Sequence, residues 1–257
     1  MDLQINGRTA LVAASTGGLG LAVARALALD GAKVAVTGRR ADVAKRVAAD
    51  LPSAIGIPAD LQTNEGVDTA LRRTQDELGE IDILVLNGPG PKPGPAATLS
   101  SAEMANAFHS LVEPHHHLVS RILPGMRARK WGRILALGSS GVAAPLPNLA
   151  VSNTGRAALA AYLKTLAAEV AEDSVTVNML LPGRIATDRV GELDQAAADR
   201  TGVTLDEIQT ASRRSIPAGR YGDPDEFGAA AAFLCSGPAS YITGVALRCD
   251  GGLIRTL

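Results

Sequence analysis

The 257-residue sequence has few aromatic residues, only two cysteines and no long apolar segment. Because aromatic side chains make up 3% of it, alanine, valine, leucine and isoleucine must build the core. Cys235 and Cys249 are too few for a disulfide framework and lack the spacing of metal ligands. No run of about 18 apolar residues is present, and the start lacks the basic and apolar segments of a signal peptide. We therefore expect a cytoplasmic protein that does not bind membranes.

An excess of charge of one sign is also missing. The 25 lysines and arginines nearly balance the 26 aspartates and glutamates, so the formal net charge is -1. Domains that bind nucleic acid carry a basic face or stripe, and no block of like charges provides one here. We expect a small-molecule substrate rather than a nucleic acid as the partner.

Short apolar runs alternate with longer amphipathic segments along the chain. Strands that alternate with helices indicate right-handed crossovers and a parallel sheet. We expect one α/β domain over 1–257, a doubly wound, Rossmann-type, mainly parallel sheet of seven strands flanked by helices. The irregular segment 184–221 is expected to form a substrate lid. The predicted strands are 9–14, 33–37, 53–57, 81–86, 133–137, 175–180 and 245–248.

The segment between the first strand and the first helix has the composition of a phosphate-binding turn. Glycines there let backbone N–H groups and a helix N-terminus approach a pyrophosphate. The second strand ends at Arg39 and Arg40 rather than at an acidic residue, which favours the 2′-phosphate of NADP(H) over NAD(H). The cofactor contacts expected from the turn are Ser15, Thr16, Gly18, Leu19 and Gly20.

Further candidate cofactor residues follow the third and fourth strands. In open α/β sheets, ligands bind outside the carboxyl ends of the strands. Asp60 and Leu61 follow the third strand, and Asn87 and Gly88 follow the fourth. The next segment is rich in proline, and we expect it to form a stiff loop beside the cofactor cleft.

These motifs, with several later ones, resemble the short-chain dehydrogenase/reductase family over essentially the whole chain, particularly its 3-oxoacyl-carrier-protein-reductase-like branch. The resemblance implies a nicotinamide cofactor and a homodimer or homotetramer. It also implies cofactor contacts from Pro182, Gly183 and Thr187, with the threonine at the nicotinamide carboxamide. The later motifs are Gly132-Arg133-Ile134, Ser139, residues 175–178, Pro182-Gly183, Thr187, residues 220–224, 242–244 and 250–252.

The resemblance breaks at the catalytic positions. Family members use an Asn, a Ser and a Tyr-x-x-x-Lys pair, in which the tyrosine is the general acid/base. Ser139 matches the serine, but Ser152 occupies the tyrosine position, Arg156 the lysine position, and Leu111 or a neighbour the asparagine position. We take Ser139, Ser152 and Arg156 as the candidate catalytic residues, and we expect no metal.

The phosphate turn departs from the family pattern as well. The usual Thr-Gly is Ala13-Ala14, and the usual Asn-Asn-Ala-Gly is Leu86-Asn87-Gly88-Pro89. The extra methyl group of Ala14 predicts a different turn. Imperfect cofactor and catalytic motifs of this kind resemble those of a subgroup of reductase-like proteins.

The substitutions leave three functions open. A serine hydroxyl is a far weaker acid than a phenol, whose pKa is about 10, and arginine stays charged. The first is an NADP(H)-dependent oxidoreductase that acts on a carbonyl or hydroxyl group with an atypical proton donor. The second is a non-redox isomerase, lyase or cyclase, and the third is a catalytically silent binding protein. Ser152 and Arg156 are four residues apart and share a helix face, so with Ser139 they suit an anion or an oxyanion.

Other polar residues stand near these positions in the sequence. Tyr162 falls on a different helix face from Arg156, and Tyr221 follows the lid and is able to swing in. Pro114 is expected to kink the helical segment 100–129 near Ser110. Arg184, Arg189, Arg213 and Arg214 lie on or beside the lid, where they either meet an anionic substrate or are solvated.

All four histidines lie between positions 109 and 117. Consecutive helix residues point about 100° apart, so His115, His116 and His117 do not converge on one metal. His109, Glu113 and His117 do share a face, which suits either a zinc or iron site or contact with a partner subunit. A single histidine that reaches the substrate is a further alternative.

Overall fold

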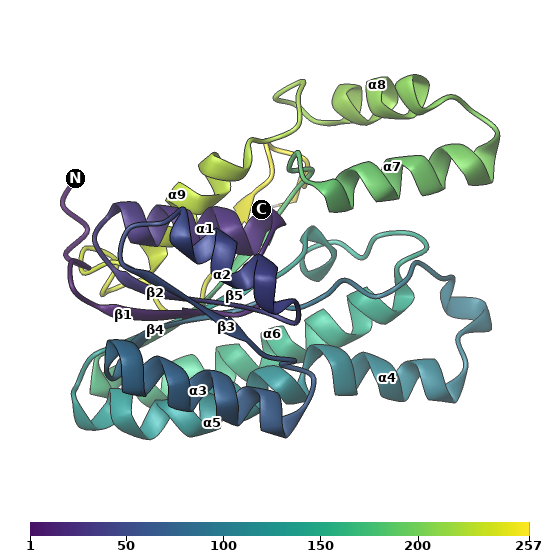
Figure 1. The fold of residues 1–257 in the computed structure, drawn as a ribbon. Helices are drawn as coiled ribbons and strands as arrows, with labels where there is room; N and C mark the ends of the chain where they lie inside the picture. Colours follow the sequence, from purple (N-terminus) through teal and green to yellow (C-terminus); the bar gives the residue numbers. More distant parts are fainter. Residues whose placement is uncertain (257) are drawn as a thin grey trace.

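The computed structural model describes residues 1–256, and its centre is a seven-stranded parallel sheet (Figure 1). The strand order is β3-β2-β1-β4-β5-β6-β7, and every neighbouring pair is parallel. The predicted doubly wound α/β fold is confirmed. The strands are β1 (Thr9–Val12), β2 (Lys33–Gly38), β3 (Ala54–Pro58), β4 (Ile81–Leu86), β5 (Gly132–Leu137), β6 (Val175–Pro182) and β7 (Ala246–Cys249).

Helices cover both faces of the sheet, because side chains alternate between two apolar clusters along each strand. Ala10 and Val12 face α1, α2 and α9, whereas Leu11 faces α3, α5 and α6. None of the helices described is long and apolar enough to cross a membrane. The helices are α1 (Gly18–Leu29), α2 (Ala41–Ala49), α3 (Asn64–Leu78), α4 (Ser101–Leu111), α5 (Glu113–Ala128), α6 (Ala150–Val170), α7 (Asp188–Thr201), α8 (Leu205–Ser215) and α9 (Pro224–Leu234), with 3-10 turns η1 (Ala96–Thr98), η2 (Ser140–Val142) and η3 (Ala171–Asp173).

Pro114 divides the helical segment that the sequence predicts as 100–129. The structure has two helices there, α4 and α5, and the break falls at Val112, whose φ is -120° and ψ is -56°. Pro114 occupies the first turn of α5, where a missing N–H removes no helical hydrogen bond. The chain therefore changes direction near Leu111, where the family places its asparagine.

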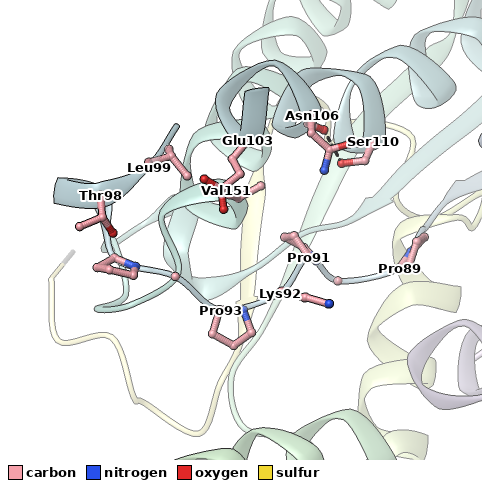
Figure 2. A pocket seen from close by; sticks show the side chains of 13 residues that line it. Pro89, Pro91, Lys92, Pro93, Thr98, Leu99, Glu103, Asn106, Ser110 and Val151 are labelled. Atoms are coloured by element: carbon pink, nitrogen blue, oxygen red, sulfur yellow. Dashed lines mark hydrogen bonds between the residues drawn. The ribbon is translucent and has the colours of Figure 1, made fainter. Parts of the chain in front are cut away.

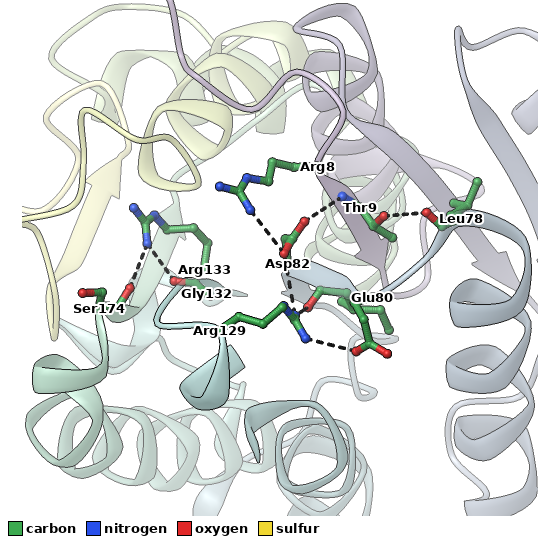
Figure 3. A network of polar contacts seen from close by, with 10 residues as sticks. Arg8, Thr9, Leu78, Glu80, Asp82, Arg129, Gly132, Arg133 and Ser174 are labelled. Carbon is green, nitrogen blue, oxygen red and sulfur yellow. Dashed lines mark hydrogen bonds and ion pairs between the residues drawn. The ribbon is translucent and has the colours of Figure 1, made fainter. Parts of the chain in front are cut away.

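The amino-terminal ends of the strands are held by a network of charged groups (Figure 3). Asp82, at the start of β4, accepts a hydrogen bond from the Thr9 amide at 3.3 Å and pairs with Arg8 at 3.5 Å and Arg129 at 3.6 Å. Arg129 also pairs with Glu80 at 3.1 Å. The charges neutralise one another, so we assign this edge of the sheet a structural role.

Trp131, the single tryptophan, lies at the same edge. The guanidinium carbon of Arg8 is 4.0 Å from the centre of its ring and that of Arg133 is 4.5 Å away, so two cations contact the indole. Arg133 is buried, and it donates hydrogen bonds to the carbonyl oxygens of Gly132, Ser174 and Ser236.

The segment 184–221 contains α7 and α8, which lie side by side and stand away from the sheet (Figure 1). Asp194 of α7 is fully buried and connects the two ends of this segment. It accepts a hydrogen bond from the Tyr221 hydroxyl at 2.7 Å and pairs with Arg184. The two helices are thus fixed to the chain at both ends of the segment.

Candidate active site

The turn after β1 still joins the strand to α1, although alanine occupies a position where the family has glycine. Ala14 adopts a left-handed conformation with φ of 46°, which explains why β1 ends at Val12 and not at Ala14 as predicted. The Ala14 amide donates to Thr37 Oγ1 at 3.0 Å, and its carbonyl accepts from Asn87 Nδ2 at 3.0 Å. Gly20 is required beside it, because a Cβ there would lie 2.5 Å from the Ala14 oxygen.

Ser15 and Thr16 fasten this turn to β2. The Ser15 hydroxyl is buried, donates to the Val12 carbonyl at 2.7 Å and accepts from the Thr37 amide at 3.0 Å. Thr16 lies over Gly38, where a Cβ would stand 2.6 Å from the threonine methyl carbon. The Ser15 hydroxyl thus stabilises the turn through hydrogen bonds to β1 and β2.

The N-terminus of α1 has the geometry that a pyrophosphate requires. Gly17 is its N-cap and makes no side-chain capping bond, so the first amides of the helix have no side-chain acceptor. Gly18 has φ of 54°, and no atom lies within 4 Å of a Cβ built on either glycine. Open space before unpaired helix amides fits a phosphate group. Leu19 and Gly20 follow in the first turn.

Two exposed arginines, Arg39 and Arg40, stand at the end of β2, next to this turn. Neither makes an ion pair with any residue of the 1–256 range. One position further along the same edge, Asp60 follows β3 and accepts from the Gln62 amide at 3.1 Å. Leu61 packs against the core beneath it.

The candidate catalytic residues come from β5 and α6. Ser139 follows β5, and its hydroxyl accepts from the Gly141 amide at 3.1 Å. Arg156 extends from α6 to the same strand end, where Nη1 donates to the Leu137 carbonyl at 2.8 Å. Ser152 lies one turn before Arg156 on the same helix. The structure thus brings the ends of β5 and α6 together as the sequence predicts.

Arg156 is mostly buried and has no acidic partner in the described part of the chain. Burial, together with the positive charge of Arg189, lowers its pKa from 12.5 to about 10. The guanidinium remains charged at neutral pH, and a buried charge without a counterion is costly. This unneutralised cation is the strongest electrostatic feature beside Ser139 and Ser152.

His115 lies near this cation. Sequence reasoning did not single out this residue among the four histidines. It is 5% exposed, and its Nδ1 is 2.9 Å from the Leu111 carbonyl. Burial holds its pKa below the ordinary 6.5, and the charge of Arg156 acts in the same direction. Its Nε2 edge is turned towards Gly88, 3.8 Å from where a Cβ would be. In the sequence, the one indication of this burial is that His115 stands four residues after the apolar Leu111.

A proline-rich loop, 89–95, lines a pocket beside α4 and the start of α6 (Figure 2). It is anchored to the start of α6, because the Gly94 amide donates to Asn148 at 2.8 Å and the Ala150 amide donates to Gly94 at 3.1 Å. The loop, α4 and Val151 enclose a cavity of about 370 Å³. Arg189 of α7 reaches this loop from the other side and donates from Nη2 to the Pro91 carbonyl at 2.9 Å.

The predicted nicotinamide-side residues lie at the end of β6. Gly183 passes so close to Asp250 that a Cβ would lie 2.6 Å from its Cα, so glycine is needed for packing. Pro182 ends the strand, and Thr187 is the N-cap residue of α7 without a capping hydrogen bond. Thr187 thus begins the helix that carries Arg189.

The remaining candidates are engaged elsewhere. Tyr162 contacts the His116 ring edge-on, with 5.6 Å between ring centres, and the Tyr221 hydroxyl is bonded to Asp194. His109 pairs with Glu113 at 2.8 Å, and His117 bonds Asn64 at 2.7 Å. Among residues 1–256 no three His, Cys, Asp or Glu side chains are grouped to hold a metal ion.

Comparisons with known proteins agree with this architecture. A family model described as enoyl-(acyl carrier protein) reductase matches residues 13–254. A 3-oxoacyl-(acyl-carrier-protein) reductase of Vibrio cholerae is 32% identical over 254 residues, which cover 98% of this chain and 99% of that protein. D-beta-hydroxybutyrate dehydrogenase of Cupriavidus necator is 31% identical over 260 residues, with 98% and 99% covered. L-sorbose reductase of Gluconobacter frateurii, solved with NADPH and L-sorbose, superimposes with a TM-score of 0.93 at 30% identity and covers 100% of both chains.

Proposed function

The chain belongs to the short-chain dehydrogenase/reductase family of oxidoreductases, and we propose that it transfers a hydride between NADP(H) and a carbonyl or hydroxyl carbon of a small molecule. The observation that carries the proposal is the turn after β1, whose helix amides are open to a phosphate although Ala14 replaces glycine. The crystallised L-sorbose reductase, which is similar over its whole length, holds NADPH and supports the same assignment.

The residues present fit this cofactor. The amides at the start of α1 would hold the pyrophosphate, and Asn87 keeps the turn in place through Ala14. Arg39 and Arg40 are exposed at the end of β2 and would bind the 2′-phosphate that distinguishes NADP(H) from NAD(H). Bound NADPH would supply the hydride.

The side chains at the end of β5 would act on the substrate oxygen. In the direction of reduction, the carbonyl carbon accepts the hydride and the oxygen takes up one proton, so the products are an alcohol and NADP⁺. Ser139 and Ser152 would donate hydrogen bonds to that oxygen, and the charge of Arg156 would favour the oxyanion. The serine hydroxyls are far weaker acids than a phenol, so in this proposal solvent water supplies the proton.

One observation favours a second candidate, a non-redox isomerase, lyase or cyclase. All three tyrosines are engaged or remote, since Tyr162 meets His116, Tyr221 bonds Asp194 and Tyr241 is fully exposed. A site with oxyanion donors but without a phenol suits an enolate intermediate. Oxidation of NADPH during turnover separates the two candidates.

The first test is a fluorescence titration of the full chain with NADPH and with NADH. We expect NADPH to bind at micromolar concentrations and NADH much more weakly. Replacing Arg39 and Arg40 together with alanine removes charge-assisted hydrogen bonds and should weaken NADPH about 10–100-fold without affecting NADH. Arg46→Ala, at an exposed position of α2, is the matched control. Absence of binding by either dinucleotide would overturn the proposal.

A further inference from the structure

We propose that the substrate carries a carboxylate, and that Arg156 and Arg189 bind it from two sides of the site. The inference rests on the proposed function for the reaction, but the anion-binding pair is tested separately below. The two arginines come from different elements. Arg156 belongs to α6, beneath the site, and Arg189 belongs to α7, which stands above it.

Arg156 has donors to spare. A guanidinium carries five N–H donors, and in the described structure only Nη1 of Arg156 has an acceptor, the Leu137 carbonyl. Arg133, the other arginine held in the interior, is different because it donates to three backbone carbonyls. Arg133 is therefore satisfied by the fold, whereas Arg156 keeps a charge and donor groups that no group of the described residues satisfies.

Arg189 is placed to complete the site. It sits in the first turn of α7, and its Nε and Nη2 lie 3.2 and 3.3 Å from where a Cβ on Gly90 would be. Nη2 also bonds the Pro91 carbonyl, which holds the side chain against the proline-rich loop. After burial, the charge of Arg189 is the second cause that lowers the pKa of Arg156, so the two cations repel one another. An anion between them would relieve that repulsion.

The charges favour a carboxylate over a phosphate. Arg189 forms an exposed pair with Glu192 at 3.2 Å, so the two arginines and this carboxylate together carry one net positive charge. Arg156 contributes one positive charge without an acidic partner among the described side chains. A monoanion balances one charge, and the flat guanidinium fork matches the two oxygens of a carboxylate.

The position of the pair further narrows the substrate class. Arg156 is one helical turn from Ser152, so an anion bound to its free donors lies close to the carbonyl that the serines would hold. A carboxylate one or two carbons from the reacting carbonyl fits this spacing. The geometry points to 2-oxo or 3-oxo acids and the corresponding hydroxy acids.

The test uses the full chain and measures ligand binding by calorimetry, with and without NADPH. The probes are pyruvate and acetoacetate, their neutral methyl esters, and inorganic phosphate. We expect at least one acid to bind more tightly than its ester by tenfold or more. Arg156→Gln should weaken that acid about 10–100-fold, and Arg189→Gln should weaken it less, because Arg189 is partly neutralised by Glu192. Arg72→Gln, at an exposed position of α3, should bind as the parent does.

Three results would overturn the inference: equal binding of acid and ester, tighter binding of phosphate than of either acid, or unchanged binding in Arg156→Gln. Arg156→Lys keeps the charge and should retain part of the affinity, which separates loss of the cation from loss of folding. The hydride-transfer proposal fails differently. If carboxylates bind through Arg156 but NADPH never binds, only the oxidoreductase assignment falls. If NADPH binds and no acid does, only the carboxylate assignment falls.

Discussion

The side-chain amide of Asn87 is 3.0 Å from the carbonyl oxygen of Ala14, to which it donates a hydrogen bond that joins the ends of β4 and β1. These strands are neighbours at the point where the strand order of the sheet reverses, which is where open α/β sheets bind ligands. The bond holds an alanine in a conformation that glycine adopts more easily. Asn87 therefore supports the cofactor turn from the neighbouring strand.

Replacing Asn87 with alanine should loosen this turn. The partly buried Ala14 carbonyl would lose its hydrogen-bond donor, at a cost of about 1–2 kcal/mol in the free energy of unfolding. Affinity for NADPH should fall with it, because the helix amides would no longer be held in place. Urea unfolding and the NADPH titration measure the two effects. Unchanged values in both would show that Asn87 does not support the turn.

Ala14→Gly should make the protein more stable. The left-handed conformation costs a non-glycine residue about 1–2 kcal/mol, and the greater freedom of glycine in the unfolded chain offsets part of that gain. We expect the free energy of unfolding to rise by up to about 1 kcal/mol in urea unfolding. Ala229→Gly, at an exposed position inside α9, is the control and should lower it by about 0.5–1 kcal/mol. A loss of stability in both variants would contradict the strained turn.

Restoring the family's Tyr-x-x-x-Lys pair should convert the site into an ordinary ketone reductase. The double variant Ser152→Tyr with Arg156→Lys places a phenol beside Ser139 and a lysine one turn later. A positioned general acid is worth about 10²–10⁴-fold, so the rate of NADPH oxidation with a neutral ketone should rise by about 10²-fold or more. Ser152→Phe with Arg156→Lys supplies the ring without the hydroxyl. An equal gain in that control would rule out proton donation as the cause.

His115 should make stability depend on pH in the acidic range. Burial keeps its pKa in the folded state below the ordinary 6.5, so between these two values the unfolded chain binds a proton that the folded protein does not. Stability is therefore lost as the pH falls through 6.5 towards the folded pKa. Urea unfolding at pH 7.5 and 5.5 should show a smaller loss in His115→Gln than in the parent. His109→Gln, which changes an exposed histidine, should retain the parent's loss.

Removing the charge of Arg156 should stabilise the ligand-free protein. Its pKa of about 10 in the folded state lies below the ordinary 12.5, so the folded protein holds this proton less tightly than the unfolded chain does. The cost of the buried cation is fully present below pH 10 and is relieved only as the pH rises above it. In urea unfolding at pH 7, Arg156→Met should raise the free energy of unfolding by about 1 kcal/mol, because relief of the buried charge exceeds the loss of one hydrogen bond to Leu137. A destabilised, folded Arg156→Met would indicate that the arginine serves the fold.

The sequence predicted the sheet well, because strands buried on both faces are continuous apolar runs and glycines or prolines mark their ends. It also placed the two segments that carry Ser139 and Arg156 at one edge. It predicted a continuous β1 up to Ala14, since a left-handed alanine leaves no mark in the apolar pattern. The hydrogen bonds that stabilise this conformation come from Thr37 and Asn87, which are distant in the chain.

Long-range contacts account for the other features that the sequence did not reveal. In the sequence, Asp194 is one of four acidic residues along α7, yet in the structure it is buried and contacts Arg184 and Tyr221. From the sequence, Arg189 is a solvated lid residue or a substrate contact, whereas in the structure its side chain is bonded to the proline-rich loop at Pro91. Both roles depend on where α7 lies relative to distant parts of the chain, and local periodicity carries no information about that.

Trp131, held between Arg8 and Arg133 at the amino-terminal edge of the sheet, makes this chain its own optical reporter. Indole emission depends on the cations against the ring, and both cations separate from it when the sheet comes apart. The candidate site lies at the opposite edge, so ligands there leave this indole in place. Without dinucleotide present, tryptophan emission should therefore follow unfolding of this edge of the sheet, and no label is needed to record it.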